Sequence, residues 1–416
     1  MTGMLVAVAA CAGTGGDGAG EATVRDSSGI TIVENAGGVW APGSGWSLGA
    51  EPMVQLGGNA TEPSYDFSQV TGALMLGNGS IAVANSSSSE IRFFDAAGVY
   101  QFASGRQGSG PGEYGAITGM FRTPADSLVV LDILVRRLTV LGPDGGVGRS
   151  FSLGGLGGAM VPGADGSISM SLPAGLLDDG SLVGVSLGLQ INAERAGNFR
   201  DSMPAIRFGP DGAVLDTLGW FPGIEMQEMT LNFGGQSIST PTGVPLGRNT
   251  LIVAAGSRVY VATNDRFEVE VREPAGRLTS LIRANGAPRE LKPDGVALHR
   301  KDQVQLMDAN LGAGLPPQLR DQMVEHLNTV AYPTTLPFIA NILLDDAGNL
   351  WVQEQDQPGD RTPRFAVFDA TGRLQGWVDM PERFQPTQIR SGKVIGIWRD
   401  QDDVEHVRVY ALNRGS

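Results

Sequence analysis

The chain has 416 residues, of which 44 are acidic and 30 basic, so its formal net charge is -14. An acidic surface repels nucleic-acid phosphates, and no basic run with interleaved aromatics offsets it, so we expect no nucleic-acid partner. One cysteine and three histidines exclude an intramolecular disulfide and disfavour a multi-thiol or multi-histidine metal centre. The 60 glycines and the hydrophobic content of 41% favour a turn-rich β fold with an ample core.

Residues 1–11 resemble the end of a truncated bacterial lipoprotein signal peptide. A short apolar run leads through Val8-Ala9-Ala10 to Cys11, which matches a lipobox, where the cysteine is acylated and becomes the first residue. No Lys or Arg precedes this run, so we expect the true start codon to lie upstream. The alternative is a cytoplasmic N-terminus with a buried Cys11. Residues 12–24 are rich in Gly, Ala and Thr, which predicts a flexible tether.

Six stretches share one pattern, in which a tight polar turn leads at once into a short apolar run. A hairpin enters a buried strand in this way. They are Gly77–Asn85, Ala125–Asp132, Asp178–Val185, Ala255–Val261, Asp346–Val352 and Arg390–Ile397.

A second set of turns, such as Phe93–Gly98 and Val367–Gly372, closes these units and is followed by an alternating strand. Each unit therefore reads as four antiparallel strands, and a spacing of roughly 45 residues is typical of β-propeller blades. We predict an all-β, six-bladed β-propeller over residues 25–416. The last unit lacks an outer strand, which Met53–Leu56 or Ile30–Val33 could supply to close the ring.

Residues 286–337 interrupt the repeats between the fourth and fifth blades. After Pro316-Pro317, the apolar residues Leu319, Met323, Leu327 and Val330 have helical spacing, and proline is tolerated in a first helical turn. We expect a partly helical insertion that packs across one face, either as a structural cap over a loop or as a lid on a ligand pocket.

The segment Gly105–Tyr114, with Ile81–Asn85 and Ile91–Asp95, resembles the NHL-like repeats of bacterial six-bladed β-propeller proteins. The lead-in Arg25–Ile30 and the hairpin Asp345–Val352 are similar to secreted members of that group. The resemblance implies the fold and covers the chain from about Arg25 onward. It implies no activity, because these members mostly lack a known one.

In propellers of this type, the loops between the second and third strands gather on one face around the central channel. Their charged rim predicts a ligand or partner surface, and the alternative is a solvated face. The predicted residues are Glu90, Asp132, Arg136, Asp265, Arg266, Arg361 and Asp402.

The sequence does not point to a catalytic site. There is no Gly-x-Ser-x-Gly elbow or convincing Ser/His/Asp set, and strand alternation around His406 predicts an ordinary exposed position. No cofactor is expected, with calcium as the weaker alternative, because some six-bladed propellers with lactonase activity hold it through Glu, Asn and Asp oxygens. The candidate ligands are Asn85, Asp132, Asn264 and Asn341.

The leading hypothesis is a lipid-anchored, extracytoplasmic propeller in the cell envelope, on the periplasmic or outer-membrane face. It would bind a protein or small-molecule ligand through one face, without definite catalytic activity. One alternative is a calcium-dependent esterase or lactonase at the channel mouth, and the other is a structural scaffold in an envelope assembly. Fold alone does not decide among them.

Overall fold

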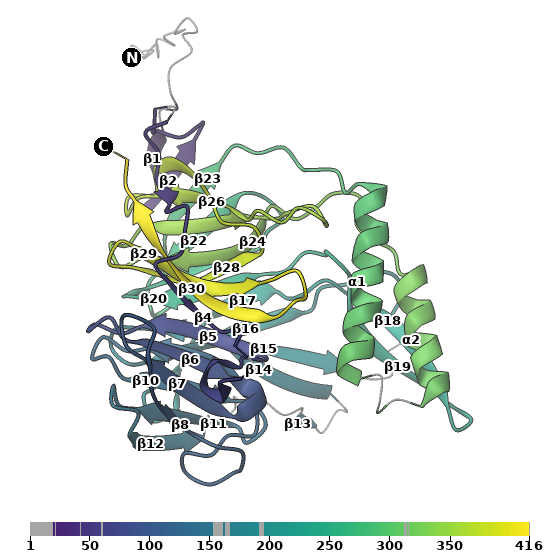
Figure 1. The fold of residues 1–416 in the computed structure, drawn as a ribbon. Helices are drawn as coiled ribbons and strands as arrows, with labels where there is room; N and C mark the ends of the chain where they lie inside the picture. The colour runs from purple at the N-terminus through teal and green to yellow at the C-terminus, as the bar shows by residue number, and fades with distance from the viewer. Residues whose placement is uncertain are drawn as a thin grey trace, which may run out of the picture.

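The computed structural model describes residues 20, 22–41, 43–59, 61–152, 161–162, 167–190, 195–311, 314 and 316–415. Antiparallel sheets are arranged in a propeller-like manner, and two helices stand at one side of them (Figure 1). Cys11 and most of the predicted tether lie outside the described residues.

Three sheets are separate four-stranded antiparallel units with strands in chain order. Each contains one of the polar turns predicted from the sequence, for example Gly77–Ser80, where Asn78 accepts a hydrogen bond from the Ser80 amide and Gly79 has a φ of 87°. The strands are β5 (Val70–Met75), β6 (Ile81–Asn85), β7 (Glu90–Phe94), β8 (Tyr100–Ser104); β9 (Ile117–Arg122), β10 (Leu128–Asp132), β11 (Arg137–Leu141), β12 (Val147–Ser152); and β24 (Ile339–Leu344), β25 (Leu350–Glu354), β26 (Arg364–Phe368), β27 (Leu374–Asp379).

A fourth sheet joins strands from the two distant parts of the chain. Its members are β28 (Phe384–Arg390), β29 (Lys393–Arg399), β30 (Glu405–Asn413), β3 (Ser47–Leu48) and β4 (Val54–Leu56). Strand β4 pairs antiparallel with β30, with Leu56 opposite Val407. Of the two segments predicted as candidates for the missing strand, Met53–Leu56 therefore supplies it, whereas Ile30–Val33 pairs with residues 280–282 instead.

The remaining two predicted units are fused in one eleven-stranded sheet, so four sheets rather than six stand apart as blades. The fusion is a parallel contact between Gly175 and Ala254. A side chain at Gly175 would place its Cβ 2.1 Å from the Ala254 carbonyl oxygen, so only glycine permits this approach. The strands are β13 (Val161–Pro162), β14 (Ser167–Leu176), β15 (Leu182–Gln190), β16 (Ser202–Phe208), β17 (Val214–Pro222), β20 (Leu251–Ala255), β21 (Arg258–Ala262), β22 (Glu268–Arg272), β23 (Leu278–Ala284), β1 (Thr23–Ser27) and β2 (Ile30–Asn35).

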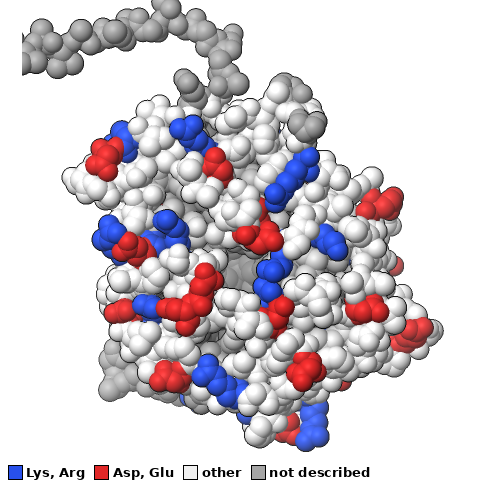
Figure 2. Space-filling view, turned by 90° about the vertical axis from the view of Figure 1, so that its left-hand side faces the viewer, with Lys and Arg blue, Asp and Glu red and all other residues white. Residues whose placement is uncertain are grey.

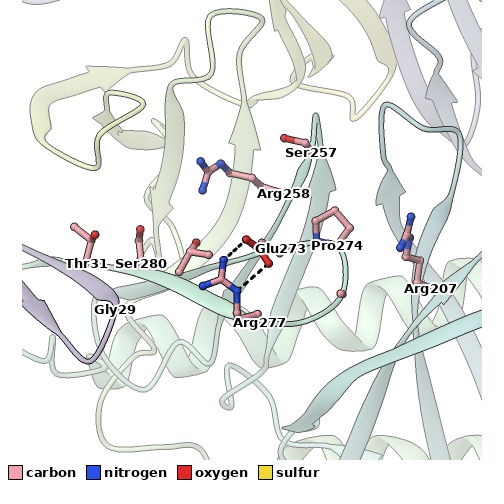
Figure 3. A pocket seen from close by; sticks show the side chains of 11 residues that line it. Gly29, Thr31, Arg207, Ser257, Arg258, Glu273, Pro274, Arg277 and Ser280 are labelled. Atoms are coloured by element: carbon pink, nitrogen blue, oxygen red, sulfur yellow. Dashed lines mark hydrogen bonds and ion pairs between the residues drawn. The ribbon is translucent and has the colours of Figure 1, made fainter.

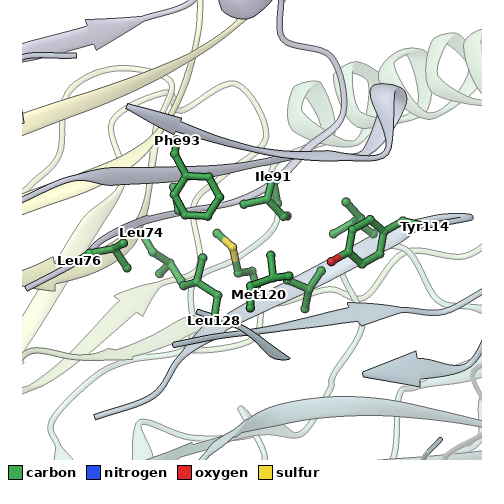
Figure 4. Close-up of a cluster of buried hydrophobic side chains, with 12 residues drawn as sticks. Leu74, Leu76, Ile91, Phe93, Tyr114, Met120 and Leu128 are labelled. Carbon is green, nitrogen blue, oxygen red and sulfur yellow. The ribbon is translucent and has the colours of Figure 1, made fainter. Parts of the chain in front are cut away.

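The core consists of apolar layers between neighbouring sheets. In the cluster of Figure 4, Leu74, Ile91 and Phe93 from one sheet meet Met120 and Leu128 from the next. Burial of these faces holds the sheets together, because a sheet face that is apolar must pack on another element.

The predicted insertion contains two helices, α1 (Pro293–Leu311) and α2 (Pro317–Thr329), between β23 and β24. Helix α2 covers the predicted helical spacing, whereas α1 was not predicted. A hairpin that was also not predicted, β18 (Met226–Phe233) with β19 (Gln236–Gly243), joins them: the Asn232 amide donates to Gln322 Oε1 at 2.7 Å. We call α1, α2 and this hairpin the cap (Figure 1).

The described residues also include two short 3-10 helices, η1 (Pro63–Tyr65) and η2 (Ser86–Ser88). Within the described part of the chain, no helix combines the length and apolar character that crossing a bilayer requires.

Candidate functional site: an arginine-lined cleft

An open cleft of about 740 Å³ lies at the edge of the eleven-stranded sheet (Figure 3). It lies at the start of β23, whereas the connection that leads to the cap leaves the other end of that strand. We call it the arginine cleft. Its lining residues are Gly29, Thr31, Arg207, Ser257, Arg258, Glu273, Pro274, Ala275, Arg277, Thr279 and Ser280.

Four pieces of chain build the arginine cleft. The β20–β21 and β22–β23 turns form two sides, and β2 adds a third because it pairs parallel with β23, with Thr31 opposite Ser280. Arg207 comes from β16, which belongs to the β14–β17 part of the eleven-stranded sheet, beyond the contact between Gly175 and Ala254. The β22–β23 turn is held close to β17, where a Cβ on Gly276 would lie 2.3 Å from the Leu218 carbonyl oxygen.

Two of the three arginines in the cleft have carboxylate partners. Arg277 donates from Nε to Glu273 Oε2 at 2.9 Å, and this bond holds the pKa of Glu273 below its ordinary value. Arg207 forms an ion pair with Asp179, and its Nη1 lies 3.5 Å from an Asp216 carboxylate oxygen.

Arg258 differs from the other two arginines. It is exposed, and in Figure 3 it extends from its turn over the cleft without a dashed line to the residues drawn. No described residue forms a hydrogen bond or ion pair with its guanidinium. Its donors are therefore available to a ligand, and a guanidinium fork matches the geometry of carboxylate and phosphate oxygens.

The lining has three arginines and one glutamate, in a chain whose net charge is -14. Glu273 offsets Arg277, and Asp179 and Asp216 offset Arg207, so Arg258 is the lining arginine whose charge has no ion-pair partner among the described residues. Figure 2 views the face of the molecule opposite the cap, where acidic and basic side chains are interspersed around a central hollow. The local excess of positive charge in the cleft is therefore that of Arg258. It suits an anion that carries several oxygen acceptors.

Asp132, one of the seven residues predicted for the ligand face, acts as a backbone staple. Its buried carboxylate accepts hydrogen bonds from four amides, those of Gly115, Ala116, Leu134 and Val135. These bonds hold the loop before β9 against the turn after β10, which satisfies amides that would otherwise be buried without partners.

The other calcium candidates also bond to backbone amides. Asn85 Oδ1 accepts from the Ser68 amide at 2.9 Å, and Asn264 Oδ1 accepts from the Asn249 amide at 2.9 Å. Asn341 Oδ1 accepts from its neighbour Ile342. Among the described residues, no three His, Cys, Asp or Glu side chains are grouped so that they could hold a metal ion. The calcium hypothesis stays a prediction.

Two further predicted residues already have arginine partners. Glu90 lies 3.1 Å from Arg92, and Asp265 lies between Arg200 at 3.1 Å and Arg248 at 3.3 Å. These carboxylates are neutralised locally, which leaves little free charge for a ligand.

The remaining predicted residues are exposed and dispersed. Arg266 Nε lies 4.0 Å from a Glu268 oxygen, and Arg361 Nη1 lies 3.5 Å from a Glu382 oxygen. Arg136 and Asp402 are also exposed. Within the part of the chain that the structure describes, no hydrogen bond or ion pair joins two of the seven residues, and none of the seven lines the arginine cleft.

The expectation that His406 is exposed was wrong. The residue is only 6% exposed, its Nε2 lies 3.3 Å from Asp400 Oδ2, and its ring packs on Trp398 at 5.1 Å. The segment before η1 covers it, because a Cβ on Gly58 would lie 2.3 Å from the imidazole. This cover comes from a distant part of the chain, which strand alternation does not reveal.

Sequence reasoning missed Arg207, Arg258 and Arg277. A signal for two of them was available in the strand order. In a unit of four antiparallel strands, the turn between the first two strands and the turn between the last two lie at the same end of the unit. Arg258 and Arg277 follow two such turns in the same unit, so their proximity could have been inferred. The prediction instead considered the loops at the opposite end.

No family model matches the sequence, and no curated protein matches it. The chain has 12% identity to a solved structure of a candidate exported protein from Bacteroides fragilis, with a TM-score of 0.44 and coverage of 92% of this chain and 99% of that one. A DUF4221 family member from Bacteroides vulgatus gives 10% identity, a TM-score of 0.47 and coverage of 89% and 99%. A gluconolactonase from Xanthomonas campestris gives 11% identity, a TM-score of 0.37 and coverage of 84% and 87%. These similarities are too low for any property of those proteins to be carried over.

Proposed function

We propose that this chain is an extracytoplasmic binding protein that captures a multivalent oxyanion in the arginine cleft. The observation that carries the proposal is the guanidinium of Arg258, which has no hydrogen bond or ion pair with a described residue, in a cleft that Arg207 and Arg277 also line. A cleft of about 740 Å³ is larger than one inorganic phosphate needs, so the ligand carries several carboxylate, phosphate or sulfate groups.

The chemistry of the lining favours binding over catalysis. Ser257 and Ser280 supply hydroxyls, but the lining includes no histidine that could activate either of them as a nucleophile. Thr279 already donates its hydroxyl to the Val271 carbonyl at 2.9 Å. The one carboxylate in the lining, Glu273, is bonded to Arg277, which holds its pKa below the ordinary value and makes it a weak base.

The proposal includes a lipid anchor at Cys11 and a six-bladed architecture. The lipobox-like Val8-Ala9-Ala10-Cys11 supports the anchor, and replacement of Cys11 by Ala should move the protein from the membrane fraction to the soluble fraction. The six-blade count is supported by β14–β17 and β20–β23, two antiparallel four-strand runs within the eleven-stranded sheet. Each run has the strand order of the separate units.

Calorimetric titration with tripolyphosphate and with a galacturonate trimer tests the proposal and separates phosphate from carboxylate ligands. Arg258→Met should weaken binding of the preferred anion by tenfold or more, because it removes the free guanidinium but keeps the side-chain stem. Arg266→Met is the matched control, since that arginine is exposed and lies outside the cleft. Equal affinity of Arg258→Met and wild type, or no binding of either anion, would refute the proposal.

A further inference from the structure

A second, smaller cavity lies at the other end of β23, between the eleven-stranded sheet and the sheet β24–β27. Its volume is about 210 Å³, below the range for drug-sized ligands. Three aromatic side chains line it, and two charged side chains join them: Phe267, Phe338, Trp377, Glu354 and Arg289. We call it the aromatic pocket.

Backbone hydrogen bonds hold the walls of the aromatic pocket in place. The Ala284 amide donates to the Phe267 carbonyl at 3.1 Å, and the Gln355 amide donates to the Phe338 carbonyl at 3.2 Å. The Leu336 amide donates to the Arg289 carbonyl at 2.8 Å. The pocket is therefore preformed, and a ligand would not have to order these segments.

The walls offer an apolar surface that is only partly covered by protein. Phe267, Phe338 and Trp377 are partly buried and pack against the buried cluster that includes Ala366 and Leu374. An apolar group of a ligand could complete this layer. Its transfer from water would supply the non-directional part of the affinity.

The two charged residues of the aromatic pocket do not neutralise each other. Glu354 accepts a hydrogen bond from Trp377 Nε1 at 2.9 Å, which orients its carboxylate. Neither Glu354 nor Arg289 forms an ion pair with any residue that the structure describes. The nearby Asp356 does not line the pocket; its carboxylate accepts from Gln353 Nε2 at 3.4 Å, and the charges of both Arg289 and Glu354 act on it.

This charge arrangement selects among ligand classes. An organic cation without a carboxylate would be repelled by the guanidinium of Arg289, and a simple carboxylate would be repelled by the carboxylate of Glu354. A molecule that carries both an ammonium and a carboxylate complements both residues. The small volume and the aromatic walls add one apolar substituent.

We propose that the aromatic pocket binds a free α-amino acid with an apolar side chain. The side chain packs on Phe267, Phe338 and Trp377, the ammonium group pairs with Glu354, and the carboxylate pairs with Arg289. This site is separate from the arginine cleft, so either can fail without the other.

Calorimetric titration with L-phenylalanine and L-leucine, followed in parallel by tryptophan fluorescence, tests the assignment. At least one of the two amino acids should bind. Phenethylamine and 3-phenylpropionate, which each lack one charge of phenylalanine, should bind at least tenfold more weakly than the amino acid that binds. No binding of either amino acid at 10 mM, or equal binding of the singly charged analogues, would overturn the proposal.

Two variants assign the binding to the pocket. Glu354→Gln removes the charge but keeps an acceptor for the Trp377 indole, and Arg289→Met changes an exposed residue. Each should weaken amino-acid binding by tenfold or more, whereas the exposed Arg361→Met control should not. Unchanged affinity in either folded pocket variant would contradict the assignment, and Arg289→Met carries the test if Glu354→Gln does not fold.

Discussion

Replacing Asp356 with asparagine should stabilise the folded protein at neutral pH. Asp356 is half-buried in the loop after β25, and burial raises its pKa to about 6 from the ordinary 3.8. At pH values between these two pKa values, Asp356 keeps its proton in the folded protein but has lost it in the unfolded chain. In the wild type this group therefore makes stability fall as the pH rises from about 4 to about 6, and the deficit persists above pH 6. Asparagine carries no charge and removes the deficit.

The size of the effect follows from the shift. A change from 3.8 to about 6 corresponds to roughly 3 kcal/mol at about 1.4 kcal/mol per pKa unit. Because the side chain is still partly exposed, solvent screening reduces this to about 1.5 kcal/mol. The hydrogen bond from Gln353 survives in the variant, since an amide oxygen also accepts.

Urea unfolding at pH 4.5 and pH 7.5 measures this quantity directly. The free energy of unfolding of Asp356→Asn, minus that of the wild type, should be larger at pH 7.5 than at pH 4.5 by about 1 kcal/mol, because part of the deficit is already present at pH 4.5. Asp402→Asn, an exposed change outside this loop, is the control and should show no such difference. A difference that is flat with pH, or larger at pH 4.5, would refute the reasoning.

Two further variants test the staple and the ring closure. Asp132→Ala should lower the free energy of unfolding by about 3–5 kcal/mol, because four backbone amides lose their acceptor. The exposed control Asp402→Ala should stay within about 0.5 kcal/mol of the wild type. A cost below about 1 kcal/mol for Asp132→Ala would contradict the role of its carboxylate in holding these amides. Leu56→Ala should lower the free energy of unfolding in urea by about 2–5 kcal/mol, because Leu56 in β4 is only 1% exposed. The variant should also bind more of a hydrophobic dye than the wild type. The control Val24→Ala, on the exposed strand β1, should show neither effect, and equal behaviour of the two variants would show that β4 is not needed for closure.

The strand units could be predicted from the sequence because their signals are local. A turn such as Gly77–Ser80 and the strand after it depend on residues that are adjacent in the chain. The fusion of two units could not be predicted in this way. It depends on Gly175 meeting Ala254, and a glycine in a strand gives no sign of which distant backbone approaches it.

The helical insertion was predicted in part for a similar reason. Helix α2 begins at Pro317 and has regularly spaced apolar residues such as Met323 and Leu327. Helix α1 places polar residues such as Lys301 and Gln303 among its apolar ones, so its periodicity is weak. The β18–β19 hairpin carries Gly234-Gly235 between its strands, a recognised two-residue hairpin signal that sequence reasoning overlooked.

The candidate sites were the hardest part to predict. Asp and Asn at strand ends, such as Asp132 and Asn264, can either bind a cation or accept backbone amides, and sequence does not distinguish these roles. Glu354 and Arg289 come from different parts of the chain and meet only in the folded pocket, whereas Arg258 and Arg277 share one unit and their proximity was overlooked. Only the folded arrangement shows which charges lack a partner.

The pairing of β4 with β30 constrains the order in which this protein can be completed. Gln55 in β4 bonds to Arg408 in β30, a residue 353 positions later in the chain. At ribosomal speeds of about 5–20 residues per second, β4 waits roughly 18–70 s for its partner to be synthesised. Throughout that interval β4 is a strand without its partner, and unpaired strand groups are prone to wrong pairing. Delayed folding, as in a chain kept unfolded for transport, would let both strands become available together.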